Sequence, residues 1–438
     1  MLPTDVDTDV QPPMRIPLGH FVVALALLLA AVGIGLDGGR SVSLSAGLAH
    51  VHLLLVGWVC VTIAGAMTQF VPVWSGVRLH SRRLAGAQLG LLAVGLVGFA
   101  VTLHAGSFGL APAFAGVLLL GFWVFVYNVG RTLARARPLD VTERHFSYAL
   151  ACFLVVSTLG LLLAVGFRVP GVLGPLDRTG VRGAHVALAL FGGVLLTVFG
   201  ALYQLVPMFA QSDLDAFDER LQSLEETGYT AGLLLLAAGR LLGHALLARL
   251  GGVLVLAGVL AVAVVMARRL RAASVEWGPM LRRYAVVPLA AVLWVAWTLP
   301  HWLADPLAYD AAFGAPGAFS ILVLGVVGFV VTGTLYHVVP FIVWVNRYSD
   351  RLGFEEVPMI DDLYVDALAW ADLALFGGGT ALLVAGDAIT LPRPVTTLGS
   401  VAVAFGLALF TLNLWLVVWR HATKPTLANR LGWSVGQQ

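Results

Sequence analysis

The chain has 438 residues, of which 59% are hydrophobic and 11% are charged, and its formal net charge is +2. A soluble domain carries about 25% charged residues, so this composition excludes a water-soluble globular protein and indicates a polytopic membrane protein. We expect contact with a lipid bilayer and no nucleic-acid partner. The two cysteines, Cys60 and Cys152, both fall in apolar segments, which excludes a disulfide framework and a paired-cysteine metal motif.

Apolar stretches long enough to span a bilayer, about 20 residues each, recur along the whole chain. We expect a cytoplasmic N-terminal tail over residues 1–16 and no cleavable signal peptide, because the residues before the first apolar stretch are polar and acidic. A single twelve-helix membrane domain over residues 17–438 should follow. The predicted spans are residues 17–36, 48–73, 84–104, 110–132, 146–168, 184–210, 228–247, 250–268, 284–303, 317–346, 367–388 and 395–420.

The basic residues predict the orientation of these spans. If the N-terminus is inside, 19 of the 26 Lys and Arg residues lie on the inner side. The positive-inside rule then places both termini in the cytoplasm of a prokaryotic-type cytoplasmic membrane. The inner segments 211–227 and 347–366 are acidic and are expected to be solvated loops, with a docking surface as the alternative.

An internal repeat relates the second and sixth predicted spans. Residues 49–74, "AHVHLLLVGWVCVTIAGAMTQFVPVW", align without a gap with residues 184–209, "AHVALALFGGVLLTVFGALYQLVPMF". The tenth span keeps the glycine and proline positions but has Ala318 in the histidine position. The spacing of 135 and then 133 residues equals four spans. The matching positions are His50 and His185, Gly57 with Gly192 and Gly325, Gly65 with Gly200 and Gly333, Gln69 and Gln204, and Pro72 with Pro207 and Pro340.

This repeat predicts an all-α fold of twelve transmembrane helices. They would form three four-helix units around a pseudo-threefold axis, at about residues 17–140, 141–275 and 276–425. The shared glycines would allow close helix approach, and the prolines would mark the inner helix ends.

Histidine inside a membrane is costly unless it has a partner. An α-helix turns about 100° per residue, so His50 and His52 point about 200° apart and cannot hold one metal together. A bis-histidine haem needs one imidazole from each of two facing helices, and His185 is expected within the first turn of its helix, level with that pair. The alternative for each histidine is a hydrogen-bonded packing residue.

Basic residues near these histidines could pair with haem propionates at the outer membrane edge. Arg178 and Arg182 precede His185, Arg40 precedes the second span, and Arg240 lies near the outer end of the seventh. His301 and His104 end the ninth and third spans on the same side, where either could complete a copper or iron site or simply lie at the interface. We expect no role for four further histidines, which should be cytoplasmic or interfacial: His20, His80, His145 and His421.

Residues 49–76, "AHVHLLLVGWVCVTIAGAMTQFVPVWSG", resemble the His-x-His helix of the haem–copper oxidase subunit I superfamily. They also resemble the second helix of the NnrS family, membrane haem proteins linked to nitric oxide stress, whose layout is the more similar. Residues 183–207 resemble the NnrS sixth helix. The resemblance implies that His52 and His185 ligate a low-spin haem b. It further implies that His50 faces a second site between spans 48–73 and 317–346.

The chain departs from the oxidase pattern, because it contains no adjacent histidine pair for a copper centre. The second site therefore stays open between a second haem, a copper ion and no metal. Three functions follow: a haem protein for electron transfer or for handling nitric oxide or oxygen; a haem–copper type oxidoreductase with an unrecognised metal site; and a small-molecule transporter with structural histidines. A redox partner or a homo-oligomer is possible for each.

Overall fold

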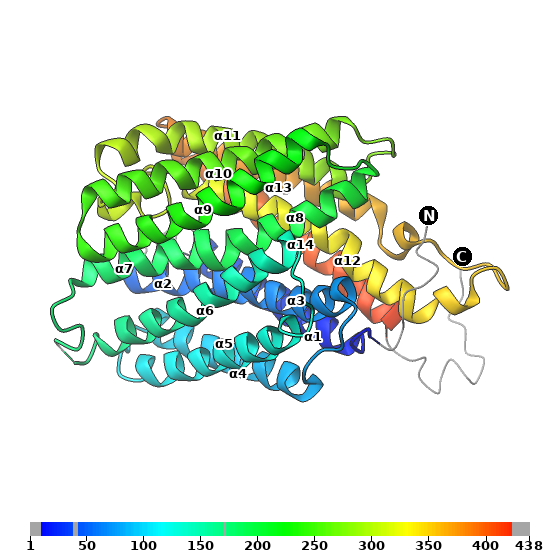
Figure 1. Ribbon diagram of the computed structural model, residues 1–438, viewed down its shortest axis with the longest axis horizontal. Helices are drawn as coiled ribbons and strands as arrows, with labels where there is room; N and C mark the ends of the chain where they lie inside the picture. The colour runs from blue at the N-terminus through cyan, green and yellow to red at the C-terminus, as the bar shows by residue number, and fades with distance from the viewer. Residues whose placement is uncertain (1–9, 38–42, 170, 423–438) are drawn as a thin grey trace.

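The computed structural model describes residues 10–37, 43–169 and 171–422, and over these residues the ordered elements are helices (Figure 1). Most of the predicted tail, Arg40 and residues 423–438 lie outside the described residues. Each predicted span overlaps a helix. The helices around the periphery are α1 (Arg15–Asp37), α4 (Arg82–His104), α5 (Ala111–Leu133), α6 (Val141–Val165), α9 (Ala216–Leu242), α10 (Ala245–Arg271), α11 (Pro279–Ala304), α13 (Asp366–Ala388) and α14 (Arg393–Val417).

Eleven helices in the described part of the chain are long and apolar enough to cross a membrane by length and composition, which supports a multi-pass membrane protein. The predicted span 228–247 lies mainly in α9, which is not among the eleven. Its N-terminal half carries charged side chains, including Asp218 and Glu225. The expectation that the acidic segment 211–227 is a solvated loop is therefore wrong. Most of the segment is helical, and both carboxylates are buried.

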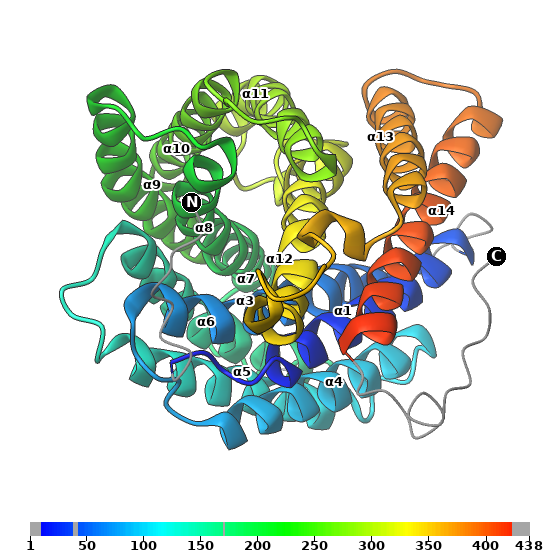
Figure 2. The same cartoon turned by 90° about the vertical axis from the view of Figure 1, so that its right-hand side faces the viewer.

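Three long helices form the centre of the bundle. They comprise α2–η2–α3 (Leu44–His52, Leu53–Cys60, Val61–Ser75), α7–η3–α8 (Arg178–Val186, Ala187–Val194, Leu195–Ala210) and η5–α12 (Ile321–Gly328, Phe329–Arg347). In the apolar 18-residue stretch of each of these helices, 78%, 83% and 89% of the window is buried inside the protein. The corresponding share is at most 56% in the other spans. In Figure 2, which looks along the helices, α3, α8 and α12 lie in the middle of the surrounding ones.

The peripheral helices pack in the same way around each central helix. The helix before it contacts it directly: α1 contacts η2 and α3, α6 contacts η3 and α8, and α11 contacts η5 and α12. The two helices after it form an antiparallel pair: α4 with α5, α9 with α10, and α13 with α14. Glycines allow these pairs to approach closely. A Cβ at Gly121 would lie 2.9 Å from the backbone nitrogen of Leu92, and one at Gly379 2.7 Å from the carbonyl oxygen of Gly399.

Each central helix contains eight residues of π-helix, η2, η3 and η5, at nearly the same place in the aligned sequences. A π-helix bonds each N–H to the carbonyl five residues back. It is rare and occurs often at functional sites. The first two of these segments begin just after His52 and His185.

Candidate functional site

The three histidines that the sequence singles out lie just before π-helices. His50 and His52 are in the last turn of α2, and His185 is in the last turn of α7. The sequence predicts His185 in the first turn of its helix, but α7 already begins at Arg178. His185 therefore lies about two turns into the helix. Charged and small residues at 178–183 are helical too, since the Asp177 side chain caps the N–H of Gly180.

Each of these imidazoles is held through its Nδ1 atom. The Nδ1 atom of His50 lies 2.9 Å from the carbonyl oxygen of Ala31, and that of His52 lies 2.7 Å from the carbonyl oxygen of Leu48. The Nδ1 atom of His185 lies 3.1 Å from the carbonyl oxygen of Val156. A carbonyl only accepts hydrogen bonds, so Nδ1 must carry the proton in all three. The Nε2 atoms have no hydrogen-bond partner among the described residues. This orientation, with Nδ1–H on a carbonyl and Nε2 free, is typical of metal-ligating histidine.

His50 and His52 face different neighbours, as the angle between them predicts. The His50 ring lies against α1, where a Cβ at Gly35 would be 2.9 Å from its Cε1 atom. The His52 ring meets the edge of Phe99 on α4, with ring centres 5.2 Å apart. The predicted second site between His50 and span 317–346 stays a prediction.

His52 and His185 are brought together on adjacent central helices. The segments η2 and η3 are in contact, and the two imidazoles lie within electrostatic range of each other. The His185 ring rests against α6, where a Cβ at Gly160 would be 3.1 Å from its Cε1 atom. The side of η3 that faces α6 is apolar, because Phe153 packs on Gly193 and also stacks with Phe122 of α5 at 5.4 Å.

The predicted propionate partners lie near the same end of the bundle. The Arg182 guanidinium lies 3.6 Å from the ring centre of Tyr309 and donates to its carbonyl at 3.0 Å. It also interacts electrostatically with both His185 and Arg240. Arg178 lies over the ring of Phe167 at 4.6 Å. All three arginines lack a carboxylate within ion-pair distance among the described residues.

Arg240 is buried, and its exposed fraction is only 4%. It donates to the carbonyl oxygens of Pro306, Ala311 and Ala312 at 3.0–3.3 Å. This arginine therefore anchors the segment between α11 and η5. Arg240 and Arg182 line a pocket of about 330 Å³.

Asp177 also lines that pocket. The backbone N–H of Gly180 lowers the pKa of its carboxyl. The pocket therefore carries a carboxylate beside its two arginines.

The structure does not bring His301 and His104 to these histidines. Both are exposed, at the ends of α11 and α4, and the His301 Nδ1 donates to Trp297 within its own helix. No group of three or more His, Cys, Asp or Glu side chains suited to a metal ion occurs in the described ranges. A haem held by two histidines is not such a group.

The sequence reasoning missed buried polar contacts at the other end of the bundle. His20 and His145 were expected to be cytoplasmic or interfacial, but their exposed fractions are 1% and 0%. The His20 Nε2 lies 3.2 Å from the amide nitrogen of Gln88, and the His145 Nε2 lies 3.1 Å from a carboxyl oxygen of Glu225.

The third such contact is between Arg283 of α11 and Asp372 of α13, which also accepts from the hydroxyl of Tyr336. A signal for these contacts exists in the sequence. A basic residue that is followed by an aromatic one packs against the second shared glycine of each central helix: His20 on Gly65, His145 on Gly200 and Arg283 on Gly333. The aromatic residues that follow, Phe21 and Tyr284, also contact Gly65 and Gly333, and Phe146 follows His145 in the sequence.

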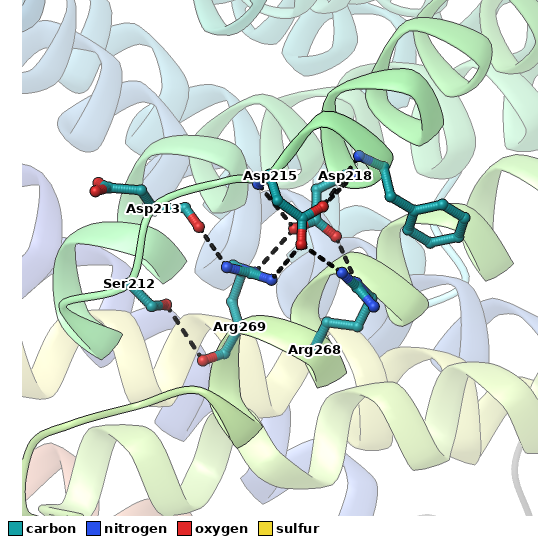
Figure 3. A network of polar contacts seen from close by, with 7 residues as sticks. Ser212, Asp213, Asp215, Asp218, Arg268 and Arg269 are labelled. Atoms are coloured by element: carbon teal, nitrogen blue, oxygen red, sulfur yellow. Dashed lines mark hydrogen bonds and ion pairs between the residues drawn. The ribbon is translucent and has the colours of Figure 1, made fainter.

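An ion-pair network fixes the start of α9 (Figure 3). Arg268 bonds Asp218 at 2.8 Å and Asp215 at 2.5 Å, and Arg269 bonds the same two carboxylates at 2.9 and 3.2 Å. Asp215 also caps the helix. The backbone N–H of Asp218 is the main cause that lowers the pKa of Asp215, and Arg268 lowers it further.

In comparisons with known proteins, no family model matches this chain, and no curated protein has a detectable sequence match.

Proposed function

We propose that this protein is a membrane haem protein that transfers single electrons, with one haem b held between His52 and His185. One observation carries the proposal. These two imidazoles lie on adjacent central helices, and each has its Nδ1 atom fixed by a backbone carbonyl, which leaves Nε2 as the free ligand atom. Haem bound in this way supplies one-electron redox chemistry.

The surroundings suit a haem. The apolar and aromatic side chains of α4, α5 and α6, among them Phe99 and Phe153, would contact its ring. Arg182 and Arg178 lie at the same end of the bundle without a carboxylate partner and would meet its propionates. With both histidines holding the haem, no protein-free position would remain for a gas, so we favour electron transfer over binding of nitric oxide or oxygen at this site.

We assign His50 no role in holding this haem. Its ring rests on α1 against Gly35, and in the aligned sequences it occupies the place of His185. His50 would be the ligand of any second haem or copper site.

We propose further that the bundle consists of three four-helix units, with α9 as the twelfth membrane helix. Three features that recur in each unit support this arrangement. Each unit has one π-helix in its central helix, one basic residue packed on its second shared glycine, and one antiparallel helix pair that follows. In the orientation set by the basic residues, both termini would be cytoplasmic and the haem would lie in the outer part of the membrane.

The test is a comparison of four purified variants from haem-sufficient cells. His52→Ala and His185→Ala should each abolish the low-spin haem spectrum. His50→Ala and the control His301→Ala, whose Nδ1 also bonds a carbonyl but at an exposed helix end, should keep it. If His50→Ala removes the spectrum and His52→Ala does not, the assignment within the pair is wrong. If none of the variants changes a haem spectrum, the proposed site is wrong.

A further inference from the structure

Three buried side chains from α6, α8 and α9 of the second unit contact one another. Glu225 of α9 accepts through Oε2 from the hydroxyl of Tyr203 of α8 at 3.0 Å, and the same oxygen lies 3.1 Å from Nε2 of His145 of α6. Their exposed fractions are 2%, 6% and 0%. The His145 Nδ1 donates to the carbonyl oxygen of Val141 at 2.8 Å, so Nε2 is the nitrogen that faces the carboxyl.

The other carboxyl oxygen of Glu225, Oε1, is buried and has no hydrogen-bond partner in the described structure. A buried carboxylate oxygen without a donor is costly. The cost is much smaller for a neutral carboxylic acid. The contact between Glu225 and His145 is therefore best satisfied when the two side chains share one proton.

The neighbouring charges are already balanced. Glu226 is bound by Arg144 at 2.5 and 2.7 Å and also interacts with Tyr148. Tyr229 donates to the carbonyl oxygen of Phe191 at 2.7 Å, and Cys152 is a free thiol. None of these groups supplies a counter-charge to Glu225, so its own protonation sets the charge of the site.

Tyr203 also borders a hollow in the molecule. A hollow of about 460 Å³ at the C-terminal end of α8 is lined by Tyr203 together with Gln204, Ser212 and Asp213. Tyr203 therefore takes part in both the lining of this hollow and the contact with Glu225.

We propose that Glu225 and His145 form a binding site for one exchangeable proton, which is filled from this hollow through Tyr203. In the filling step, a hydronium ion in the hollow gives a proton to the Tyr203 oxygen and becomes water, while the Tyr203 hydroxyl proton moves to Oε2 of Glu225. The tyrosine is regenerated, and the site changes from a net charge of −1 to neutral. This proposal does not depend on the presence of haem.

The other two units contain equivalent contacts that cannot do this. Gln88 beside His20 has no titratable proton, and Arg283 beside Asp372 remains protonated at all accessible pH values. The protein thus carries its own references: a pair without a carboxyl group, the exchangeable pair, and a pair with a fixed positive charge, each between the first and third helix of a unit.

Infrared difference spectra of the full-length purified protein, recorded between alkaline and acidic pH, test the proposal. The wild type should show a carbonyl-stretch band of a protonated carboxylic acid, sensitive to D2O, that titrates with pH. Glu225→Gln should remove this band, and Glu226→Gln, the matched control, should keep it. Glu225→Gln is expected to fold, because Gln88 with His20 is the same pair, and its size-exclusion profile would check this.

Two further variants keep the test decisive if Glu225→Gln does not fold. Gln88→Glu should add a second titrating band beside His20, and Tyr203→Phe should keep the first band but slow its exchange in D2O. A band that is insensitive to pH would overturn the proposal. So would a wild-type titrating band that is undiminished in a folded Glu225→Gln protein, Gln88→Glu without a new band, or exchange in Tyr203→Phe as fast as in the wild type.

Discussion

The Nδ1 atom of His185 lies 3.1 Å from the carbonyl oxygen of Val156, so an imidazole of a central helix is tied to the backbone of the neighbouring helix α6. This contact decides which nitrogen is free to bind a metal. His50 makes the same kind of contact with Ala31 of α1. The proposed haem site therefore depends on how α6 packs as well as on the histidine itself.

Gly160→Ala should disturb the haem without removing a ligand. The new Cβ would lie 3.1 Å from Cε1 of His185, so the ring must shift by a few tenths of an ångström and its bond to the Val156 carbonyl is disturbed. Supporting contacts of this kind typically change metal affinity by about 10–100-fold. Haem retention during dilution measures the effect. Gly35→Ala, which presses on His50 in the same way, is the matched control, and equal losses in both variants would contradict the assignment of His185.

Gly200→Ala should destabilise the bundle by about 1–3 kcal/mol, as overpacking in a dense interior does. Its Cβ would be 2.7 Å from Cβ of His145 and 3.1 Å from the carbonyl oxygen of Thr142, and neither atom can move independently of α6. Thermal unfolding in detergent measures the change. Gly228→Ala is the control, since nothing lies within 4 Å of its Cβ position, and it should be neutral or stabilising. Equal unfolding temperatures for the two variants would contradict the close packing of α6 on α8.

Arg240→Met should lower the unfolding temperature more than Arg249→Met. Arg240 is buried and serves three carbonyl groups, and hydrogen bonds from a charged group contribute about 1.5–3 kcal/mol each. Arg249 makes two such bonds, to Leu303 and Ala304, from a partly exposed position. Thermal unfolding measures both variants. An equal drop in unfolding temperature in the two would show that the burial of Arg240 contributes nothing further to stability.

Asp215→Asn should weaken the start of α9 at neutral pH but not in acid. Asparagine still caps the helix but loses the charge that binds Arg268. Because the folded state lowers the pKa of Asp215 below its ordinary value of 3.8, the carboxylate stabilises the protein above that value, and this contribution is lost as the pH falls through the lowered pKa. The gap in unfolding temperature between wild type and variant should be constant above pH 4 and should close below it. A gap that persists in strong acid would rule out the ion pair as its cause.

The positions of the helices could be predicted from the sequence because a bilayer demands long apolar segments, and each predicted segment overlaps a helix. The π-helices could not be predicted in this way. The segment Ile321–Gly328 reads as an ordinary apolar run, and its backbone pattern depends on the helices packed around it.

The residues of the candidate site could be chosen from the sequence only where their chemistry is unusual for a membrane segment. His52 and His185 stand out because histidine is rare in an apolar segment, and the angle between His50 and His52 follows from helix geometry. Glu225 and His145 were missed for a definite reason. The predicted spans begin at residues 228 and 146 and leave both residues outside the membrane, whereas α9 and α6 begin at Ala216 and Val141.

The central claim is tested most directly by the reduced-minus-oxidised absorption spectrum of the wild-type protein, purified from haem-sufficient cells, together with its haem content. The proposal predicts a Soret band and the sharp visible bands of a six-coordinate low-spin haem b, at one haem or more per chain. A protein that is folded and monodisperse but has no Soret band would contradict it.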